Sequence, residues 1–225
     1  MTAFNFVIFG DMATVATDTL NTAGPEQRPY LFSTKIHILT HLHAVLGGKG
    51  RGLFLEDCYR VMSIGLIARD IADANEMVPD MYRELWAEQL AREDGDTNPD
   101  AQPPSATVYH IGWVEAEGRM AAFEYSSADN FNGTRLKDGA WLHPNTVDEL
   151  IQDPFDLVKI TIMQKEIDDK LPNGKRAGIG GDIYLYQLTP DAIIAQRAHR
   201  CGDYDKQYRE MEEYSKESER NHDQI

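Results

Sequence analysis

The chain has 225 residues, of which 42% are hydrophobic, 26% charged and 9% aromatic. This is enough apolar material for one sizeable core, so we expect a single domain. Acidic residues outnumber basic ones 37 to 22 and give a formal net charge of −15. Such a field repels nucleic-acid phosphates and anionic lipid surfaces, so we expect neither a nucleic-acid partner nor a membrane partner.

The composition also predicts the compartment. No apolar run is long enough to span a bilayer, and the N-terminus lacks the basic start and long apolar core of a signal peptide. The two cysteines, Cys58 and Cys201, form no Cys-x-x-Cys pair, which argues against a disulfide framework or a structural zinc site. We therefore expect an unexported protein in a reducing cytoplasm.

The elements are predicted from turn residues and hydrophobic periodicity. The turn pair at Gly10 and Asp11 lies between β-branched and aromatic segments, which is typical of a hairpin. Apolar residues at helical spacing indicate two consecutive helices, with Pro79 in the first turn of the second. In chain order the predicted elements are strands 4–9 and 13–17, a loop 21–29, a strand 32–46, helices 53–71 and 77–90, an acidic, proline-rich surface loop 93–106, strands 107–113 and 120–125, a helix 146–170, a strand 182–188, and a helical end after Pro190.

The order of these elements favours one fold class. Strands cluster and helices cluster, which indicates α+β layers rather than a βαβ repeat with a parallel sheet. No G-x-G-x-x-G or P-loop spacing is present, so no nucleotide cofactor is expected. Residues 1–200 are expected to form the domain, and residues 201–225 an acidic C-terminal helix or partner-docking tail.

Thr2 is the candidate nucleophile, because removal of Met1 would give it a free α-amino group. That amine has a reference pKa of roughly 8 and would take the hydroxyl proton. Such a site also needs a cation beside the amine, a carboxylate to position the cation, and backbone N–H groups for the developing oxyanion. The sequence supplies Lys35, Asp18 and a glycine pair, Gly47 and Gly48, at suitable places.

These residues carry a resemblance to a known family. Thr2, the segments Val-Ala-Thr-Asp-Thr at 15–19 and Thr-Lys-Ile at 34–36, and Leu-Gly-Gly at 46–48 resemble the opening of proteasome β-type subunits. Those subunits belong to the N-terminal nucleophile (Ntn) hydrolase superfamily. The resemblance implies a four-layer αββα sandwich of two antiparallel sheets.

The same resemblance implies roles for the site residues. Thr2 would be nucleophile and, through its amine, base; Asp18 and Lys35 would form the activating pair. Gly47 or Gly48 would donate to the oxyanion. The resemblance further implies a peptide or other amide substrate, an acyl-enzyme intermediate and assembly into a homo-oligomer. We expect no cofactor.

One segment departs from the family pattern. Active members carry Asp-x-x-Ser-Gly where this chain reads Arg-Ala-Gly-Ile-Gly-Gly at 176–181. Ser126 and Ser127 are candidates for a further serine of the pattern. A second interpretation therefore stays open, in which the protein is a catalytically inactive structural or interaction protein of the same fold.

His37, His41 and His43 share parity along the predicted strand 32–46 and would project from one face with Lys35. Three imidazoles could ligate zinc or nickel, which leaves a third interpretation, a binding protein with a histidine-lined pocket. No acidic or thiol partner lies in the same segment, and histidines satisfied by hydrogen bonds are common, so we predict no metal site.

Overall fold

The computed structural model describes residues 2–23, 26–93, 104–145, 153, 155–172 and 174–222. Over these residues it contains two five-stranded antiparallel sheets and a separate two-stranded sheet. The strands of the first large sheet, in the order β10-β1-β2-β11-β12, are Gly139–His143 (β10), Phe4–Phe9 (β1), Met12–Asp18 (β2), Asp182–Thr189 (β11) and Ala192–Arg200 (β12).

The second large sheet and the short sheet are formed by strands between residues 20 and 135. The second sheet, in the order β5-β6-β7-β8-β9, consists of Ile36–Leu39 (β5), Ala44–Lys49 (β6), Thr107–Val114 (β7), Arg119–Ser126 (β8) and Thr134–Arg135 (β9). The short sheet pairs Leu20–Ala23 (β3) with Arg28–Phe32 (β4).

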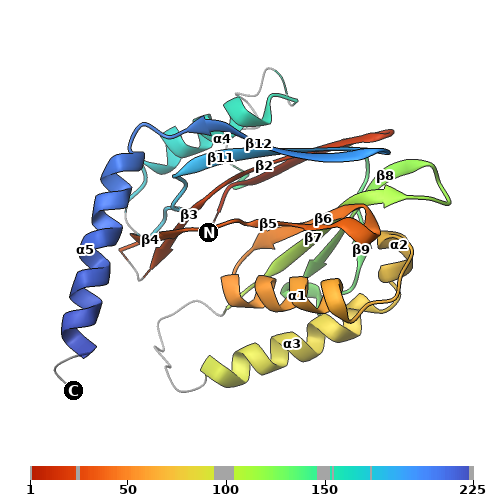
Figure 1. Cartoon of the computed structure of the whole chain (residues 1–225), viewed down its shortest axis with the longest axis horizontal. Coiled ribbons are helices and arrows are strands. Elements are labelled where there is room, and N and C mark those ends of the chain that lie inside the picture. The colour runs from red at the N-terminus through yellow and green to blue at the C-terminus, as the bar shows by residue number, and fades with distance from the viewer. Residues whose placement is uncertain are drawn as a thin grey trace.

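Most of the helices cover the outer faces of the two large sheets, and the last one lies at an end of the sandwich (Figure 1). They are Gly52–Ile64 (α1), Ile71–Ala74 (α2), Val78–Glu93 (α3), Leu157–Asp168 (α4) and Tyr204–His222 (α5), with 3₁₀ turns at Thr40–Leu42 (η1) and Ser127–Asp129 (η2). In Figure 1 the sheets lie face to face, with α4 above the first and α1 and α3 below the second, while α5 stands at one end of the sandwich beside β3 and β4. The predicted α+β sandwich of antiparallel sheets is confirmed.

The alternation of side chains along β1 explains how this strand packs against both the second sheet and α4. Successive strand residues point to opposite faces, so Phe4 and Phe6 lie between the two sheets, where Phe4 stacks on Tyr109 at 5.2 Å between ring centroids. Val7 points the other way and packs with Leu157 of α4. Because β1 is buried on both faces, it is a central strand of the sandwich.

Several predicted elements are present in the structure. The opening hairpin is β1 and β2, the hairpin of 107–113 and 120–125 is β7 and β8, and the strand 182–188 is β11. The two predicted helices are α1 and α3, and Pro79 lies in the first turn of α3. None of the helices in the described residues is long and apolar enough to cross a membrane.

Three other predictions are wrong. The predicted loop 21–29 lies within the β3–β4 hairpin, whose strands pair through backbone bonds that side-chain periodicity does not reveal. The predicted strand 32–46 is interrupted at η1, and His43 has a φ of 46° in the left-handed region. The chain after Pro190 first forms β12, because this segment completes the ladder of β11, and becomes helical at Tyr204.

Two predictions fall partly outside the described residues. The predicted helix 146–170 includes undescribed residues at 146–152 and 154; its described part is α4, which begins after its N-cap, Asp156. The predicted surface loop 93–106 falls on undescribed residues at 94–103. The division into a domain of residues 1–200 and a tail of 201–225 stays a prediction, although α5 does occupy 204–222.

Candidate active site

The first hairpin brings the N-terminus to a buried carboxylate. The register of β1 and β2 pairs Phe4 with Thr17, so the residues just before β1 lie beside Asp18, the last residue of β2. The Thr2 hydroxyl donates to Asp18 Oδ1 at 2.6 Å. Asp18 is 0% exposed and Thr2 is 9% exposed, so this contact lies at the buried floor of the site.

Lys35 reaches the same point from the second sheet, because it lies immediately before β5. Its Nζ atom donates to Thr2 Oγ1 at 2.5 Å and to Asp18 Oδ1 at 3.0 Å. A further bond goes to the Leu20 carbonyl at 2.6 Å, so every N–H of the ammonium has a partner. The structure therefore brings Thr2, Asp18 and Lys35 into direct contact where the two sheets meet.

The Lys35 ammonium has an unusual electrostatic environment. Its side chain is 8% exposed. Burial lowers the pKa of Lys35 from its ordinary value, while the charge of Asp18 and the hydrogen bond to it raise that pKa. A cation in contact with a hydroxyl oxygen favours the ionised form of that oxygen, and it lowers the pKa of any amine beside it. The arrangement is therefore suited to activating the Thr2 hydroxyl.

The Asp18 carboxylate is held in place by backbone N–H groups from separate segments. Its Oδ1 atom accepts from Ala3 at 3.0 Å, and its Oδ2 atom accepts from Leu20 at 3.2 Å and from Gly180 at 3.1 Å. Since both oxygens are fixed by these bonds, the direction in which the carboxylate faces the hydroxyl and the ammonium is fixed as well.

The segment 176–181 reaches this site without the Asp and Ser of the family pattern. The Gly180 N–H of this segment donates to Asp18. The backbone of the segment is held by Asp168, a residue that the sequence did not single out. The Asp168 carboxylate is 4% exposed and accepts from the N–H groups of Gly178 at 2.9 Å and Ile179 at 3.2 Å. An acid at a helix end followed by a glycine-rich segment was the available sequence signal.

The two candidate oxyanion glycines have different surroundings. Gly48 lines the cleft that contains Thr2. Gly47 lies where a Cβ atom would come within 2.5 Å of Phe4 Cε2 and 2.6 Å of Ile36 Cδ1, so its α-carbon is enclosed between the sheets. Of the two glycines, Gly48 is the one placed to meet a bound molecule.

A cleft of ≈ 580 Å³ opens beside Thr2 and Lys35. Its walls come from the β3–β4 hairpin, the end of β6 and the start of α1, and they include the apolar side chains of Leu31 and Leu53. A smaller hollow of ≈ 260 Å³ also borders Lys35 and is lined by Thr17 and residues of β11. Because the two hollows share Lys35, an extended molecule has room on both sides of it.

The three clustered histidines do not share one face, because the strand that would have aligned them is interrupted at η1. Each imidazole has a different environment, and no group of three or more metal-ligating side chains occurs among the residues that the structure describes. His37 stacks on Tyr59 at 4.4 Å between ring centroids, His41 Nε2 lies 3.1 Å from the Met62 carbonyl, and His43 Nε2 lies 2.6 Å from the Thr189 carbonyl.

Ser126 and Ser127 lie at the far end of β8 and serve local structure. The Ser126 hydroxyl accepts from the Ala128 N–H at 3.3 Å, and the Ser127 hydroxyl accepts from the Ala106 N–H at 3.1 Å. Neither serine lines the cleft beside Thr2. The structure therefore does not bring these two residues to the site.

Comparison with solved structures identifies the fold. No protein-family model and no curated protein matches this chain. An Anbu (Gly-1) mutant from Hyphomicrobium sp. strain MC1 matches with a TM-score of 0.61 and 15% identity, over 100% of this chain and 99% of the other. Anbu (ancestral beta-subunit) from Yersinia bercovieri matches with a TM-score of 0.56 and 11% identity, over 99% of this chain and 97% of the other.

A second structure of Anbu from Hyphomicrobium sp. strain MC1 gives a TM-score of 0.60 and 13% identity, with 99% of this chain and 97% of the other covered. The chain therefore has an Anbu-like, proteasome-like fold. The identification with proteasome β-type subunits of the Ntn hydrolase superfamily is wrong as stated, because the similar structures are Anbu proteins. At 11–15% sequence identity, structural similarity supports a shared fold only.

Proposed function

We propose that this protein is an N-terminal threonine hydrolase that cleaves a peptide or other amide bond through an acyl-enzyme. The observation that carries the proposal is the contact of Lys35 Nζ with Thr2 Oγ1 at 2.5 Å, on a hydroxyl that itself donates to Asp18. Burying an ion pair is costly, and here the pair lies at the floor of a cleft, beside a hydroxyl that a ligand can reach. That placement favours chemistry over a purely structural role.

The proposed reaction begins with attack of the Thr2 hydroxyl oxygen on the amide carbonyl carbon. The hydroxyl proton passes to the α-amino group of Thr2, and the carbonyl oxygen becomes an oxyanion beside Gly48. The C–N bond then breaks, and the amine leaves with the proton held by the α-amino group. An ester joins the acyl group to Thr2; water attacks it, releases the acid and restores the hydroxyl.

The α-amino group exists as a base once Met1 is removed. A lysine cation next to that amine lowers the pKa of the amine and so increases its neutral fraction at physiological pH. Lys35, which donates hydrogen bonds to Asp18 and to the Leu20 carbonyl, is the cation that would lower the pKa of the Thr2 amine. The proposal therefore requires a natively produced protein whose mass lacks Met1.

The test combines intact-mass measurement with covalent labelling. The protein is treated with an epoxyketone or β-lactone probe, and the adduct is located by peptide mass spectrometry. We expect labelling of Met1-free protein at Thr2, retained in Thr2→Ser and lost in Thr2→Ala. Met1-free, folded protein that gains no Thr2-dependent adduct and hydrolyses no amide substrate would overturn the proposal in favour of a catalytically inactive interaction protein of this fold.

Assembly into a homo-oligomer belongs to the same proposal. The Anbu-like fold is its support, and the acidic helix α5, which stands at one end of the sandwich, is the candidate contact element (Figure 1). Light scattering on purified full-length protein tests it. A mass of several chains is the expected result, and a monomer across the concentration range would contradict it.

A further inference from the structure

The β3–β4 hairpin is a part of the cleft wall that lies outside the two large sheets. It forms a two-stranded sheet separate from both large sheets. A two-stranded hairpin is marginally stable by itself, so its position depends on whatever packs against it. Among the described helices, α5 is the one that packs along β4.

One aromatic side chain of this hairpin belongs to both the cleft and the contact with α5. Tyr30 lines the cleft beside Thr2, and its ring meets the ring of Tyr214 edge-on, with 5.9 Å between centroids. Two residues further along, at the end of β4, Phe32 stacks on Tyr204 at 4.6 Å. These two ring pairs join the second half of β4 to α5.

α5 is itself anchored to the body of the protein close to the site. The Gln207 side chain is 6% exposed and accepts from the Gly181 N–H at 2.9 Å. Asp203, immediately before α5, accepts from Lys165 of α4 at 2.9 Å. A rigid helix fixed at this end carries Tyr214 to a defined place beside the hairpin.

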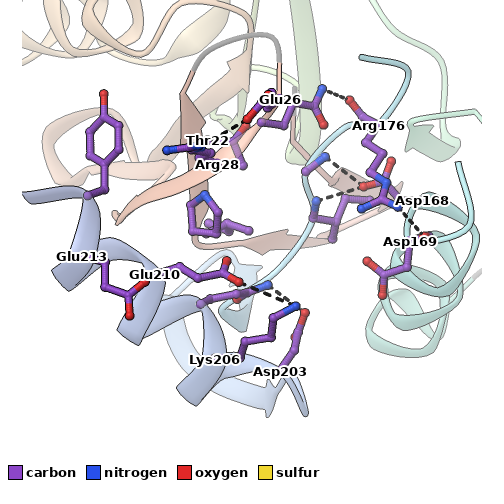
Figure 2. Close-up of a pocket in the computed structure, with 17 residues that line it drawn as sticks. Thr22, Glu26, Arg28, Asp168, Asp169, Arg176, Asp203, Lys206, Glu210 and Glu213 are labelled. Atoms are coloured by element: carbon purple, nitrogen blue, oxygen red, sulfur yellow. Dashed lines mark hydrogen bonds and ion pairs between the residues drawn. The ribbon is translucent and has the colours of Figure 1, made fainter. Parts of the chain in front are cut away.

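Behind the hairpin lies open space rather than packed core. The hairpin, α5 and the segment 176–181 all border a cavity of ≈ 700 Å³. Figure 2 shows Glu26 and Arg28 of the hairpin region on one side of this cavity and Glu210 and Glu213 of α5 on the other. The cavity gives the hairpin room to move. The ring contacts with α5 limit that movement, together with the hydrogen bonds that Gln27 and the Leu20 N–H donate to carbonyls of the segment 176–181.

We infer that Tyr214 is a positioning residue that acts through Tyr30 and sets the wall of the substrate cleft from the C-terminal helix. The inference about substrate binding rests on the proposed hydrolase; the inference about the hairpin does not. Loss of the Tyr214 ring loosens the hairpin around Tyr30, weakens substrate binding and leaves the groups that carry out the proposed chemistry in place.

The experiment compares three full-length variants with the wild type. Tyr214→Ala removes the ring, Tyr214→Phe keeps it, and Tyr208→Ala removes a 50% exposed ring of the same helix for which the described residues show no ring contact. Hydrogen exchange is followed on peptides that cover β3 and β4. We expect exchange there to rise about two- to tenfold in Tyr214→Ala, as the loss of one aromatic pair implies, and to stay unchanged in the other two variants.

Steady-state kinetics on an amide substrate give the second readout. KM is expected to rise about two- to tenfold in Tyr214→Ala with kcat within about twofold of the wild type, and Tyr214→Phe is expected to restore KM. Exchange in β3 and β4 no faster than in Tyr208→Ala, or a fall in kcat at constant KM, would overturn the inference. Absence of amide hydrolysis in Met1-free wild-type protein would contradict the proposed hydrolase function. The hydrogen-exchange measurement would still test whether Tyr214 positions the hairpin.

Discussion

Lys35 Nζ lies 2.5 Å from Thr2 Oγ1, although the two residues precede strands of different sheets. The contact therefore depends on the packing of one sheet against the other and exists only in the folded sandwich. Its chemical environment is set by the same packing, since the interface that brings the groups together also removes them from water. The first prediction follows from this dependence.

Replacement of Lys35 should affect labelling and stability together. Lys35→Met removes the cation, leaves the Asp18 carboxylate buried without it, and is expected to lower the free energy of unfolding by about 3–5 kcal/mol. Labelling at Thr2 should be lost. Lys49→Met, which removes a cation lining the same cleft outside the three-residue contact, is the control and should leave both urea denaturation and Thr2 labelling close to wild type. Wild-type labelling in Lys35→Met would contradict the role given to this residue.

Replacement of Asp168 tests the link between the segment 176–181 and the site. In Asp168→Asn one carboxylate oxygen becomes an NH₂ group that faces backbone donors, so we expect the free energy of unfolding to fall by about 1–3 kcal/mol. Labelling at Thr2 should slow, because Gly180 of the same segment binds Asp18. Asp169→Asn is the matched control, since Asp169 is 54% exposed at its side chain and bonds Lys165. Equal denaturation midpoints for the two variants would argue against this link.

The two cleft glycines Gly48 and Gly52 should differ sharply in their tolerance of a methyl group. A Cβ atom on Gly48 would lie 2.1 Å from the Thr107 carbonyl oxygen, whereas one on Gly52 would meet nothing within 4 Å. Gly48→Ala is therefore expected to cost about 1–3 kcal/mol or more through forced movement of the β6–β7 ladder. In a thermal melt, the melting temperature of Gly52→Ala should equal or exceed that of the wild type. A melting temperature of Gly48→Ala equal to that of Gly52→Ala would refute the steric argument.

His110 makes stability fall on acidification. Its imidazole is buried beside the Tyr82 hydroxyl at 2.6 Å, and burial lowers the pKa of His110 to about 3. Between that value and the ordinary pKa of 6.5 the unfolded chain binds a proton that the folded chain does not, so the free energy of unfolding falls as pH falls, by up to about 1.4 kcal/mol for each pH unit. Urea denaturation between pH 7 and pH 4 should show a shallower pH dependence in His110→Gln, and an equal slope would contradict the assignment.

The sequence predicted the residues of the site better than the path of the chain around them. Thr2, Asp18 and Lys35 could be found because each belongs to a short pattern in which residue type and interval are visible. The β3–β4 hairpin could not, because its strands are stabilised by backbone pairing and by rings of α5 that lie far along the chain. The same holds for β12, whose partner β11 defines it as a strand.

The part played by Asp168 was hidden for a different reason. Its bonds go to backbone N–H groups about ten residues ahead, and such groups carry no sequence signature. The role of Gly180 at Asp18 was hidden in the same way. Side-chain patterns thus located Thr2, Asp18 and Lys35, whereas the main-chain donors that orient the Asp18 carboxylate became visible in the folded chain.

The enclosed position of Thr2 has a practical consequence for preparing the protein. An affinity tag fused ahead of this residue would start within the cleft, where it would block the floor and keep the nitrogen of Thr2 in a peptide bond. The end of α5 points away from the sandwich (Figure 1). Purification handles therefore belong after this helix, and recombinant material with an uncleaved N-terminal extension is the wrong sample for any measurement at the site.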